Sequence, residues 1–417
     1  MPRKTERSAF AAAGRTAIIA ALLLIACGRD RDRAEPATHL YVWAADADGK
    51  ESDFLAVIDV DSLSMTYGQV VATAPIGAVH TMPHHTEMLA PARGRALFAN
   101  GYMAGKTWLF DLSDPLAPRV ERVIDSVPGF RQPHSYLRLR DGRVLATLQF
   151  GDRTRPGAAG GLALYSPSGD LVRAVSSADS SLPGADIRTY SLDAAERIDR
   201  LVTTSSPMDP TRPADVVQVW RLRDLRLLKT LRLPDEPADS ADQYPFEVRF
   251  LPDGNAFLNT RNCGFYLLTG LTSEAPAIER ILALPGGPAM CGVPTLKGRH
   301  WIMPVGTLGQ YLVLDIADPR RPRITSVLAA DAGFFPHWTA VDPGSDRLVM
   351  TSGRMVPDPP DNRVRLARFD STAGRLTWDM SFGRSGAGVS FNRDTWPHGA
   401  TGPAIPHAAV FGPGPRR

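Results

Sequence analysis

Residues 107–119 read TWLFDLSDPLAPR, and residues 310–323 read QYLVLDIADPRRPR. Each stretch is a short apolar run typical of a strand, followed by a turn in which Asp and Pro fix the backbone geometry. The recurrence of one such unit so far apart in the chain indicates an internal repeat. This repeat decides the fold.

The strand and turn occur seven times, at intervals of roughly 50 residues. The copies lie at Phe54–Asp59, Thr107–Asp111, Gly161–Tyr165, Val216–Trp220, Gly264–Leu268, Gln310–Asp315 and Val364–Phe369. Most copies follow another short apolar strand, so each unit accommodates about four strands. We therefore predict an all-β, seven-bladed β-propeller, with two packed β-sandwiches as the alternative.

The seventh blade is predicted to be shared between the two ends of the chain. Its first strand is expected at Pro406–Phe411, and the others at Leu40–Trp43, Phe54–Asp59 and Gln69–Thr73. This closure would leave no free sheet edge. The propeller domain is accordingly assigned to residues 39–417.

The charge of the chain lies in its first segment. The formal net charge is +3, and residues 1–27 carry all of it, so the remainder is neutral. A neutral domain without a basic stripe lacks the electrostatic footprint of a nucleic-acid-binding protein. We therefore predict no nucleic-acid partner.

Residues 1–27 read as an export signal. Basic residues precede a short apolar run, Ala17–Ala26, and about 20 apolar residues are needed to span a bilayer. Leu24–Cys27 resembles a lipobox, in which the Cys27 thiol accepts a lipid. Residues 28–38 would form a flexible tether, and since residue 28 is not Asp, an outer-membrane lipoprotein is favoured over an inner-membrane one. We expect the domain on the periplasmic side of a bacterial membrane, held by this lipid anchor.

Four of the nine histidines follow a proline at the start of a repeat unit. They are His84 (with His85 next to it), His134, His337 and His407. These units are the sixth, seventh, first and second blades, which are neighbours around a ring. Because the first strand of a blade lines the central channel, we expect these imidazoles to converge near the axis. Proline before each histidine restricts the backbone.

Converging imidazoles outside the cytoplasm suggest a transition-metal site. All-nitrogen sites suit copper or zinc, and copper has the higher intrinsic affinity. The sequence therefore predicts a copper ion held by His84, His85, His134, His337 and His407. The alternative is a set of turn histidines solvated independently at the channel mouth.

Cys291 lies close to the equivalent position in the fifth blade. It could be a fifth ligand or a reactive thiol, or it could pair with Cys263 in an oxidising compartment. Three cysteines cannot supply a disulfide framework for a chain of this length.

The chain resembles the selenium-binding protein family, whose bacterial members include methanethiol oxidases. Pro245–Leu251 (PFEVRFL) matches the family's PLEIRFL, and Asp315–Arg323 matches its DISDPQRPR. The paired histidines, the first histidine of an HTxH segment and the histidine of an AHE segment correspond to His84-His85, His134 and His407. The match would place Glu247 on an inner strand of blade four, near the channel or paired to Arg249.

The resemblance implies a copper-dependent oxidation of methanethiol with O2 and water to formaldehyde, hydrogen sulfide and hydrogen peroxide. The partners would be a small thiol and O2. The sequence departs from the family where its selenium-linked cysteines would stand, since Thr86 and Glu87 follow His85, and Leu137 replaces the second histidine of HTxH. Two other functions stay open, namely a non-catalytic copper-binding or metal-delivery lipoprotein, and an interaction scaffold with structural histidines.

Overall fold

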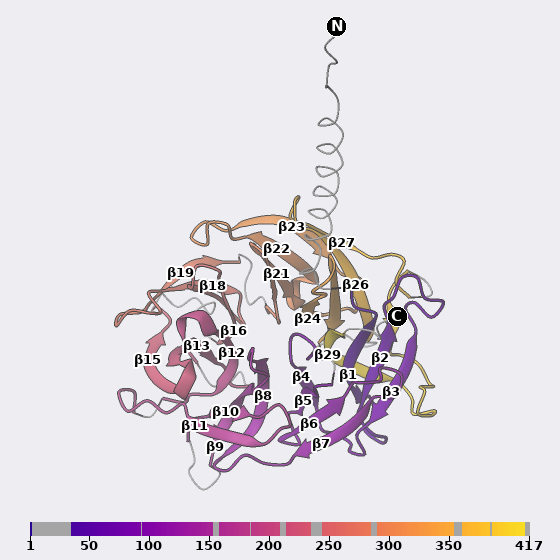
Figure 1. Ribbon diagram of the computed structural model, residues 1–417, viewed down its shortest axis with the longest axis horizontal. Coiled ribbons are helices and arrows are strands. Elements are labelled where there is room, and N and C mark those ends of the chain that lie inside the picture. Colours follow the sequence, from indigo (N-terminus) through magenta and orange to yellow (C-terminus); the bar gives the residue numbers. More distant parts are fainter. Residues whose placement is uncertain are drawn as a thin grey trace.

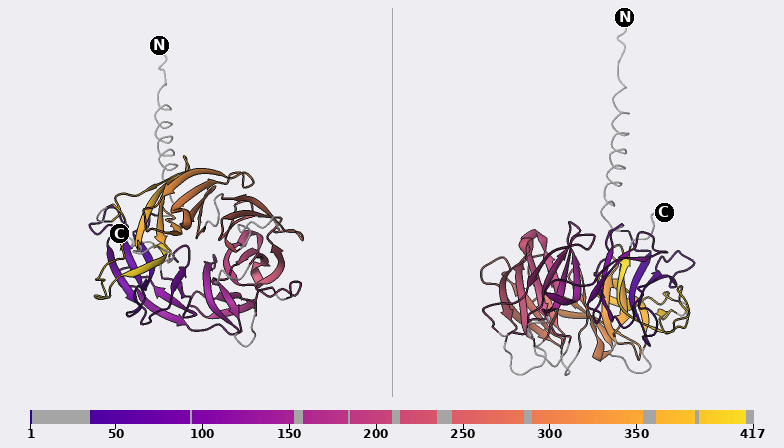
Figure 2. Two further views of the ribbon diagram at one scale, coloured as in Figure 1. Left: turned by 180° about the vertical axis from the view of Figure 1, so that it is seen from behind. Right: turned by 90° about the horizontal axis from the view of Figure 1, so that it is seen from below.

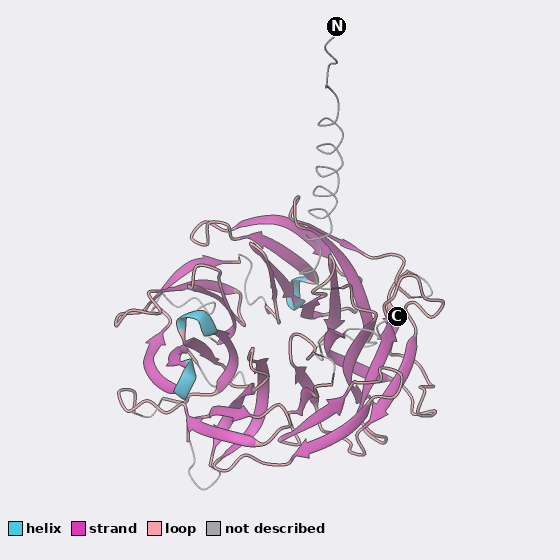
Figure 3. Ribbon diagram, viewed as in Figure 1, coloured by secondary structure: helices cyan, strands magenta, loops and turns pink. Residues whose placement is uncertain are grey.

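The computed structural model describes residues 1, 35–92, 94–152, 158–183, 185–208, 214–234, 244–284, 290–353, 361–383 and 386–412. Its strands form seven antiparallel sheets arranged as blades around a central axis (Figures 1 and 3). The prediction of an all-β, seven-bladed propeller is confirmed, and the sandwich alternative is wrong.

Each blade has four main strands, ordered below from the axis outward. Blade one consists of β4 (Pro83–Thr86), β5 (Leu97–Gly101), β6 (Lys106–Asp111) and β7 (Arg119–Ile124). Blade two consists of β8 (Phe130–Arg138), β9 (Val144–Gly151), β10 (Gly161–Tyr165) and β11 (Leu171–Ser176). Blade three consists of β12 (Thr189–Ala195), β13 (Arg200–Ser205), β14 (Val216–Arg221) and β15 (Arg226–Arg232). Blade four consists of β16 (Pro245–Phe250), β17 (Ala256–Thr260), β18 (Gly264–Thr269) and β19 (Ala277–Ala283). Blade five consists of β20 (Thr295–Lys297), β21 (His300–Val305), β22 (Gln310–Asp315) and β23 (Arg323–Ala329). Blade six consists of β24 (Pro336–Val341), β25 (Arg347–Ser352), β26 (Arg363–Asp370) and β27 (Arg375–Trp378), with β28 (Val389–Ser390) paired to β26. Blade seven consists of β29 (Ala404–Gly412), β1 (His39–Asp46), β2 (Phe54–Asp59) and β3 (Val70–Pro75).

Blade seven closes the ring with both ends of the described chain. β29 is its innermost strand and pairs antiparallel with β1, with Leu40 opposite Phe411 and Ala45 opposite Ile405. The predicted closure by N- and C-terminal strands is therefore confirmed. Because each blade is covered by a neighbour on both sides, the flat faces of the sheets are buried.

Large aromatic side chains fill the spaces between blades. Trp43 of blade seven is fully buried and packs on Trp108 and Phe110 of blade one, with ring centroids 6.1 and 5.4 Å apart. Its indole N–H donates to the carbonyl of Asn100 at 2.7 Å. Burying such a ring contributes about 3 kcal/mol, so the interfaces between blades hold the innermost strands in fixed positions.

The ring has two faces, seen edge-on in the right-hand view of Figure 2. The innermost strands begin at one face, which we call the entry face, and end at the other, which we call the exit face. Because neighbouring strands are antiparallel, β1 begins at the exit face, where β29 also ends. Both ends of the described propeller chain, at residues 35 and 412, therefore leave from this face.

A buried ion pair fixes the start of the propeller. Asp342 and Arg347 lie 2.7 Å apart, and both side chains are buried. The Asp342 carboxylate accepts the Ala37 N–H at 3.2 Å, and Arg347 donates to the Ala37 carbonyl at 2.6 Å. The predicted signal peptide and most of the tether, with Cys27, lie outside the described residues. Within the described part of the chain, no helix is long and apolar enough to cross a membrane.

Candidate metal centre

The predicted histidines lie at bulges in the innermost strands. In β4 the pairing with β5 skips His84 and His85, and in β8 the pairing with β9 skips His134. The pairings skip His337 in β24 and His407 in β29 in the same way. The histidines thus lie within the innermost strands, and each bulge turns a side chain out of the ladder toward the axis.

The five imidazoles form one contiguous cluster. The Nε2 atoms of His84 and His134 lie 2.9 Å apart, and His84 stacks on His85 with ring centroids at 4.3 Å. His407 lies 4.4 Å from His84 and 4.8 Å from His337, again between ring centroids. All five side chains are buried. The structure therefore brings these five imidazoles together, as the Pro-His positions predict.

Backbone carbonyls orient two of these rings. His134 Nδ1 lies 3.1 Å from the Tyr190 carbonyl oxygen, and His407 Nδ1 lies 2.6 Å from that of His84. A carbonyl only accepts, so each Nδ1 carries the proton and each Nε2 keeps its lone pair. Metal-binding histidines are commonly oriented by such a hydrogen bond on the other nitrogen.

Three imidazole nitrogens of the cluster have no hydrogen-bond partner among the described residues. They are His84 Nδ1, His85 Nε2 and His337 Nδ1. Leaving a buried polar atom unpaired costs about 1–3 kcal/mol. One ligand nitrogen each from His84, His85 and His134 lies within 4.8 Å of the others. Nitrogens bound to one metal at about 2.0–2.1 Å lie roughly 3 Å apart, so the orphaned atoms and the facing His84–His134 pair fit a metal ion.

Burial keeps four of the five histidines neutral. It lowers the pKa of His84 and His85 well below the usual 6.5, and neighbouring imidazoles lower it further. Burial also lowers the pKa of His134 to about 3 and that of His337 to about 4. Neutral imidazoles have the lone pairs that a metal needs.

The other side of the ring carries no histidine at the equivalent bulges. Tyr190 in β12 and Phe246 in β16 occupy the skipped positions there. Tyr190 packs on His134 with centroids 3.8 Å apart, and Phe246 stacks on Tyr190 at 4.4 Å. Sequence reasoning missed Tyr190, although aligning Thr189-Tyr190-Ser191 with Pro133-His134-Ser135 would have found it.

Glu247, next to Phe246 in β16, is a buried carboxylate. One oxygen accepts hydrogen bonds from Ser191 at 2.8 Å and from Arg249 at 2.9 Å. The other, Oε1, has no partner among the described residues, and neither does Oδ1 of Asn259, the residue directly across the strand pair. Burial raises the pKa of Glu247, while the Arg249 charge opposes that rise. Glu247 thus lies on an inner strand and is paired to Arg249, which is one of the two placements expected for it.

Cys291 is not a free thiol. It forms a disulfide with Cys263, which joins the segment before β20 to the turn between β17 and β18. A disulfide sulfur is neither a thiolate ligand nor a nucleophile, so the expectation of a fifth ligand or reactive thiol at Cys291 is wrong. The sequence could not choose because proximity around the ring does not show in the linear spacing.

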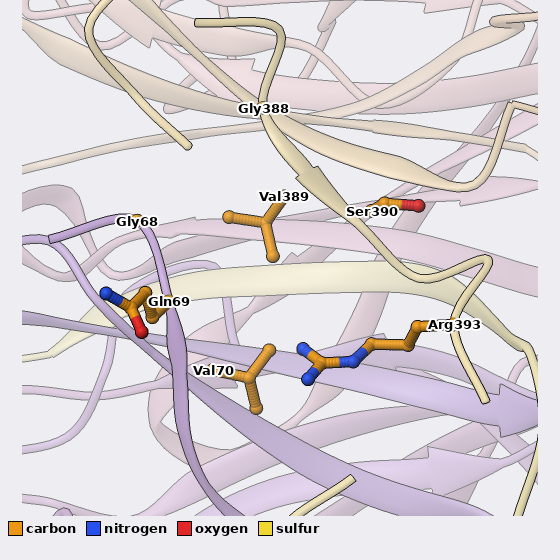
Figure 4. A pocket seen from close by; sticks show the side chains of 7 residues that line it. All are labelled: Gly68, Gln69, Val70, Gly388, Val389, Ser390 and Arg393. Atoms are coloured by element: carbon orange, nitrogen blue, oxygen red, sulfur yellow. The ribbon is translucent and has the colours of Figure 1, made fainter. Parts of the chain in front are cut away.

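Two other polar sites do not match the chemistry of the histidine cluster. Asp46, Asp48 and Glu51 lie together in an exposed turn, but the Asp48 carboxylate pairs with Lys50 at 2.7 Å. A shallow groove at the rim, between β3 and β28, is lined by Gly68, Gln69, Val70, Gly388, Val389, Ser390 and Arg393 (Figure 4). It presents no carboxylate or imidazole, so we take the histidine cluster as the candidate site.

Comparisons with known proteins bear on the family and on the fold. No family model matches the chain. The chain is 28% identical over 225 residues to a methanethiol oxidase of a Hyphomicrobium species. This region covers 48% of the chain and 49% of that protein, so the match spans about half the length of the curated relative. In structure, the chain matches a hypothetical selenium-binding protein of Sulfolobus tokodaii with a TM-score of 0.73 at 15% identity, covering 91% of this chain and 95% of that one.

The resemblance to the selenium-binding protein family is confirmed. A more distant match lies outside the selenium-binding proteins, in a periplasmic gluconolactonase of Pseudomonas aeruginosa. Its TM-score is 0.62 at 16% identity, with 89% of this chain and 98% of that one covered. At such identities the structural matches show the propeller fold alone.

Proposed function

We propose that this protein is a copper-dependent oxidase of a small thiol. The proposed reaction converts methanethiol, O2 and water to formaldehyde, hydrogen sulfide and hydrogen peroxide. The observation that carries the proposal is the cluster of five buried imidazoles, in which three nitrogens have no partner among the described residues. The sequence similarity to a methanethiol oxidase supports the reaction type.

The ligands of the metal would come from five imidazoles, those of His84, His85, His134, His337 and His407. We favour copper over zinc because the reaction is a redox reaction and zinc has no redox chemistry. When bound, copper would supply a site for the thiolate and electron exchange with O2. More imidazoles are present than a four-coordinate site needs, so one of the His84–His85 pair would orient its neighbour.

The residues opposite the histidines would shape the substrate site. Tyr190 and Phe246 present buried aromatic rings, which suit a short alkyl group and keep bulk water out. Glu247 Oε1 is the carboxylate oxygen left to take a proton from the substrate, because Ser191 and Arg249 occupy Oε2. Holding one oxygen in place fixes the other for that transfer.

The burial of the histidine cluster favours thiol oxidation over metal delivery. A metal-delivery protein must release its ion to a partner, whereas His134 is fully buried and His85 is nearly so. A scaffold would not need unpaired nitrogens at its axis. We therefore rank oxidation above delivery, and delivery above a purely structural role.

Metal analysis of the mature protein combined with thiol-dependent O2 uptake tests the proposal. We expect about one copper per chain and hydrogen peroxide formed with each methanethiol consumed. A matched control is His398→Ala, since His398 bonds Thr73 at 2.8 Å in blade seven, away from the cluster. Copper without thiol oxidation would favour metal delivery, and a metal-free native protein would favour the scaffold.

A further inference from the structure

We propose that the exit face of the propeller rests on the membrane through four exposed apolar side chains, Leu63, Met65, Leu89 and Leu116. We call them the apolar patch. They lie on blades seven and one, in the β2–β3 turn, the β4–β5 loop and the β6–β7 turn. In a propeller of this topology these connections all lie at the exit face. The proposal concerns the placement of the domain and does not depend on the proposed reaction.

The four side chains are unusually open to solvent. Their exposed fractions are 83% for Leu63, 98% for Met65, 53% for Leu89 and 62% for Leu116. Single exposed leucines are ordinary on protein surfaces, but clustered ones mark an interaction site. The patch is therefore significant because its members lie close together.

The three connections lie around the same part of blade seven, near Tyr41 and His39. Residues 90–92, beyond Leu89, share a small hollow with Leu112 at the start of the β6–β7 turn and with Tyr41 of blade seven. Asp61 and Asp114 each stand two residues before a patch leucine. The negative charges of both carboxylates act to raise the pKa of His39 at the start of β1, so both turns lie near that residue. The apolar patch is thus a local feature of two adjacent blades.

The leucines of the two turns are held outward by their own backbone. The Leu63 N–H donates to the Asp61 carboxylate at 3.0 Å, and the Leu116 N–H donates to Asp114 at 2.9 Å. Such Asp-capped turns are preformed. Apolar tips that are already ordered lose little conformational entropy on binding.

The exit-face turns of the other blades differ. Their tips carry residues such as Asp141, Glu196, Asp253, Asp318 and Ser345. Among the described residues of those turns none is a large exposed apolar side chain, although Leu171 (41% exposed) and Ile324 (50% exposed) lie at the start of the strands that follow two of them. The apolar tips thus gather on one side of this face, beside the start of the chain.

The position of the chain start identifies a bilayer as the occupant. Ala37 is fixed at the exit face by Asp342 and Arg347. Cys27, the residue expected to carry the lipid, is ten residues earlier, and a fully extended chain of that length spans at most about 35 Å. The anchor would therefore hold this face close to the membrane, where apolar tips gain by entering the interface.

This placement orients the candidate metal centre. The histidine bulges of β4 and β24 lie near the start of the strand, toward the entry face, and those of β8 and β29 lie near the middle of the strand. The entry face would then point away from the bilayer. The centre would take its substrate from the aqueous phase and not from the lipid.

Site-specific fluorescence quenching tests the proposal on the full lipidated chain. The chain is reconstituted into vesicles of phosphatidylethanolamine and phosphatidylglycerol, with or without bromine on the acyl chains. Single cysteines, Leu63→Cys and Leu116→Cys, are labelled with an environment-sensitive dye, because Cys263 and Cys291 are paired and Cys27 would be blocked by lipid. Met103→Cys is the matched control, since Met103 is 63% exposed but lies in the β5–β6 turn of the entry face.

We expect a blue shift and quenching by brominated lipid at positions 63 and 116, and neither at position 103. Equal quenching at all three positions would overturn the orientation. Absence of quenching at 63 and 116, with the protein still floating with the vesicles, would overturn the docking surface and favour a protein partner. A chain that does not float with the vesicles would show that it has no lipid anchor, and this result would overturn the proposal.

Discussion

Two halves of the central ring share a bulge in the innermost strand and differ in the side chain that the bulge carries, while the short strand β20 of blade five pairs without a bulge. In blades six, seven, one and two, the innermost strand bulges at a histidine, whereas in blades three and four the equivalent bulges carry Tyr190 and Phe246. The repeat thus supplies a position that faces the axis, and the side chain there decides what the position does. One half offers metal ligands, and the other offers an aromatic wall.

The sharpest way to break this comparison is to remove a histidine from the ligand half. His134→Ala deletes a nitrogen that faces His84 Nε2 at 2.9 Å. We expect copper stoichiometry to fall well below one per chain and thiol-dependent O2 uptake to be lost, with the fold kept. Metal analysis, oxygen electrode and circular dichroism check the three outcomes.

The control for that variant comes from outside the cluster. His398→Ala should keep full copper and full activity. Copper bound at full stoichiometry by both His134→Ala and His407→Ala would contradict the proposed centre.

A second prediction concerns the proton acceptor in the aromatic half. Glu247→Gln keeps the size of the side chain and one acceptor oxygen for Ser191, but it cannot take a proton. We expect kcat to fall about 10²-fold, with copper content unchanged and the acidic limb of the pH–rate profile lost. Asn259→Asp is a useful companion, because it places a new carboxylate across from Glu247.

A Glu247→Gln variant that loses copper in proportion to activity would contradict this role. It would show Glu247 to support the metal centre instead. A kcat within about twofold of the wild type would remove Glu247 from the chemistry.

These two regions differ in how far the sequence predicts them. The seven-fold repeat and the Pro-His positions predict the fold and the five clustered histidines, because the signal recurs with the blades. Tyr190 and Phe246 were missed because histidine itself marked the other positions, although Pro245 precedes Phe246 and Ser191 follows Tyr190 as at the histidine bulges. The Cys263–Cys291 disulfide was left open because it joins adjacent blades 28 residues apart in sequence. The unpaired nitrogens and the free oxygen of Glu247 depend on packing that no linear pattern contains.

A third prediction follows from the neutral histidines. Burial lowers the pKa of His134 to about 3 and of His337 to about 4, against 6.5 in the unfolded chain. Above pH 6.5 both states are neutral, so this contribution to stability is fully present. As the pH falls below 6.5, the unfolded chain binds protons that the native chain does not, and stability falls until the native pKa values are reached.

Urea unfolding of the metal-free protein at several pH values measures this loss. Each histidine should contribute about 1.4 kcal/mol per pH unit in that window. His337→Gln should flatten the slope by about one histidine's share, whereas Tyr190→Phe should leave it unchanged. A slope that is the same in His337→Gln and wild type would mean that His337 is not held neutral by the fold.

The smallest expected effect sharpens the comparison most. Tyr190→Phe keeps the aromatic ring that packs on His134 at 3.8 Å. It also keeps the backbone carbonyl that accepts from His134 Nδ1, because that group belongs to the main chain. The orientation of His134 and the wall of the site should therefore survive, and we expect copper content and kcat within about twofold of the wild type, with paramagnetic resonance of Cu(II) unchanged. Tyr190→His would instead extend the ligand half by one blade, and we expect its Cu(II) spectrum to shift. If Tyr190→Phe abolished O2 uptake while copper stayed bound, the phenol would belong to the chemistry, and the division between a ligand half and a packing half would fail at this residue.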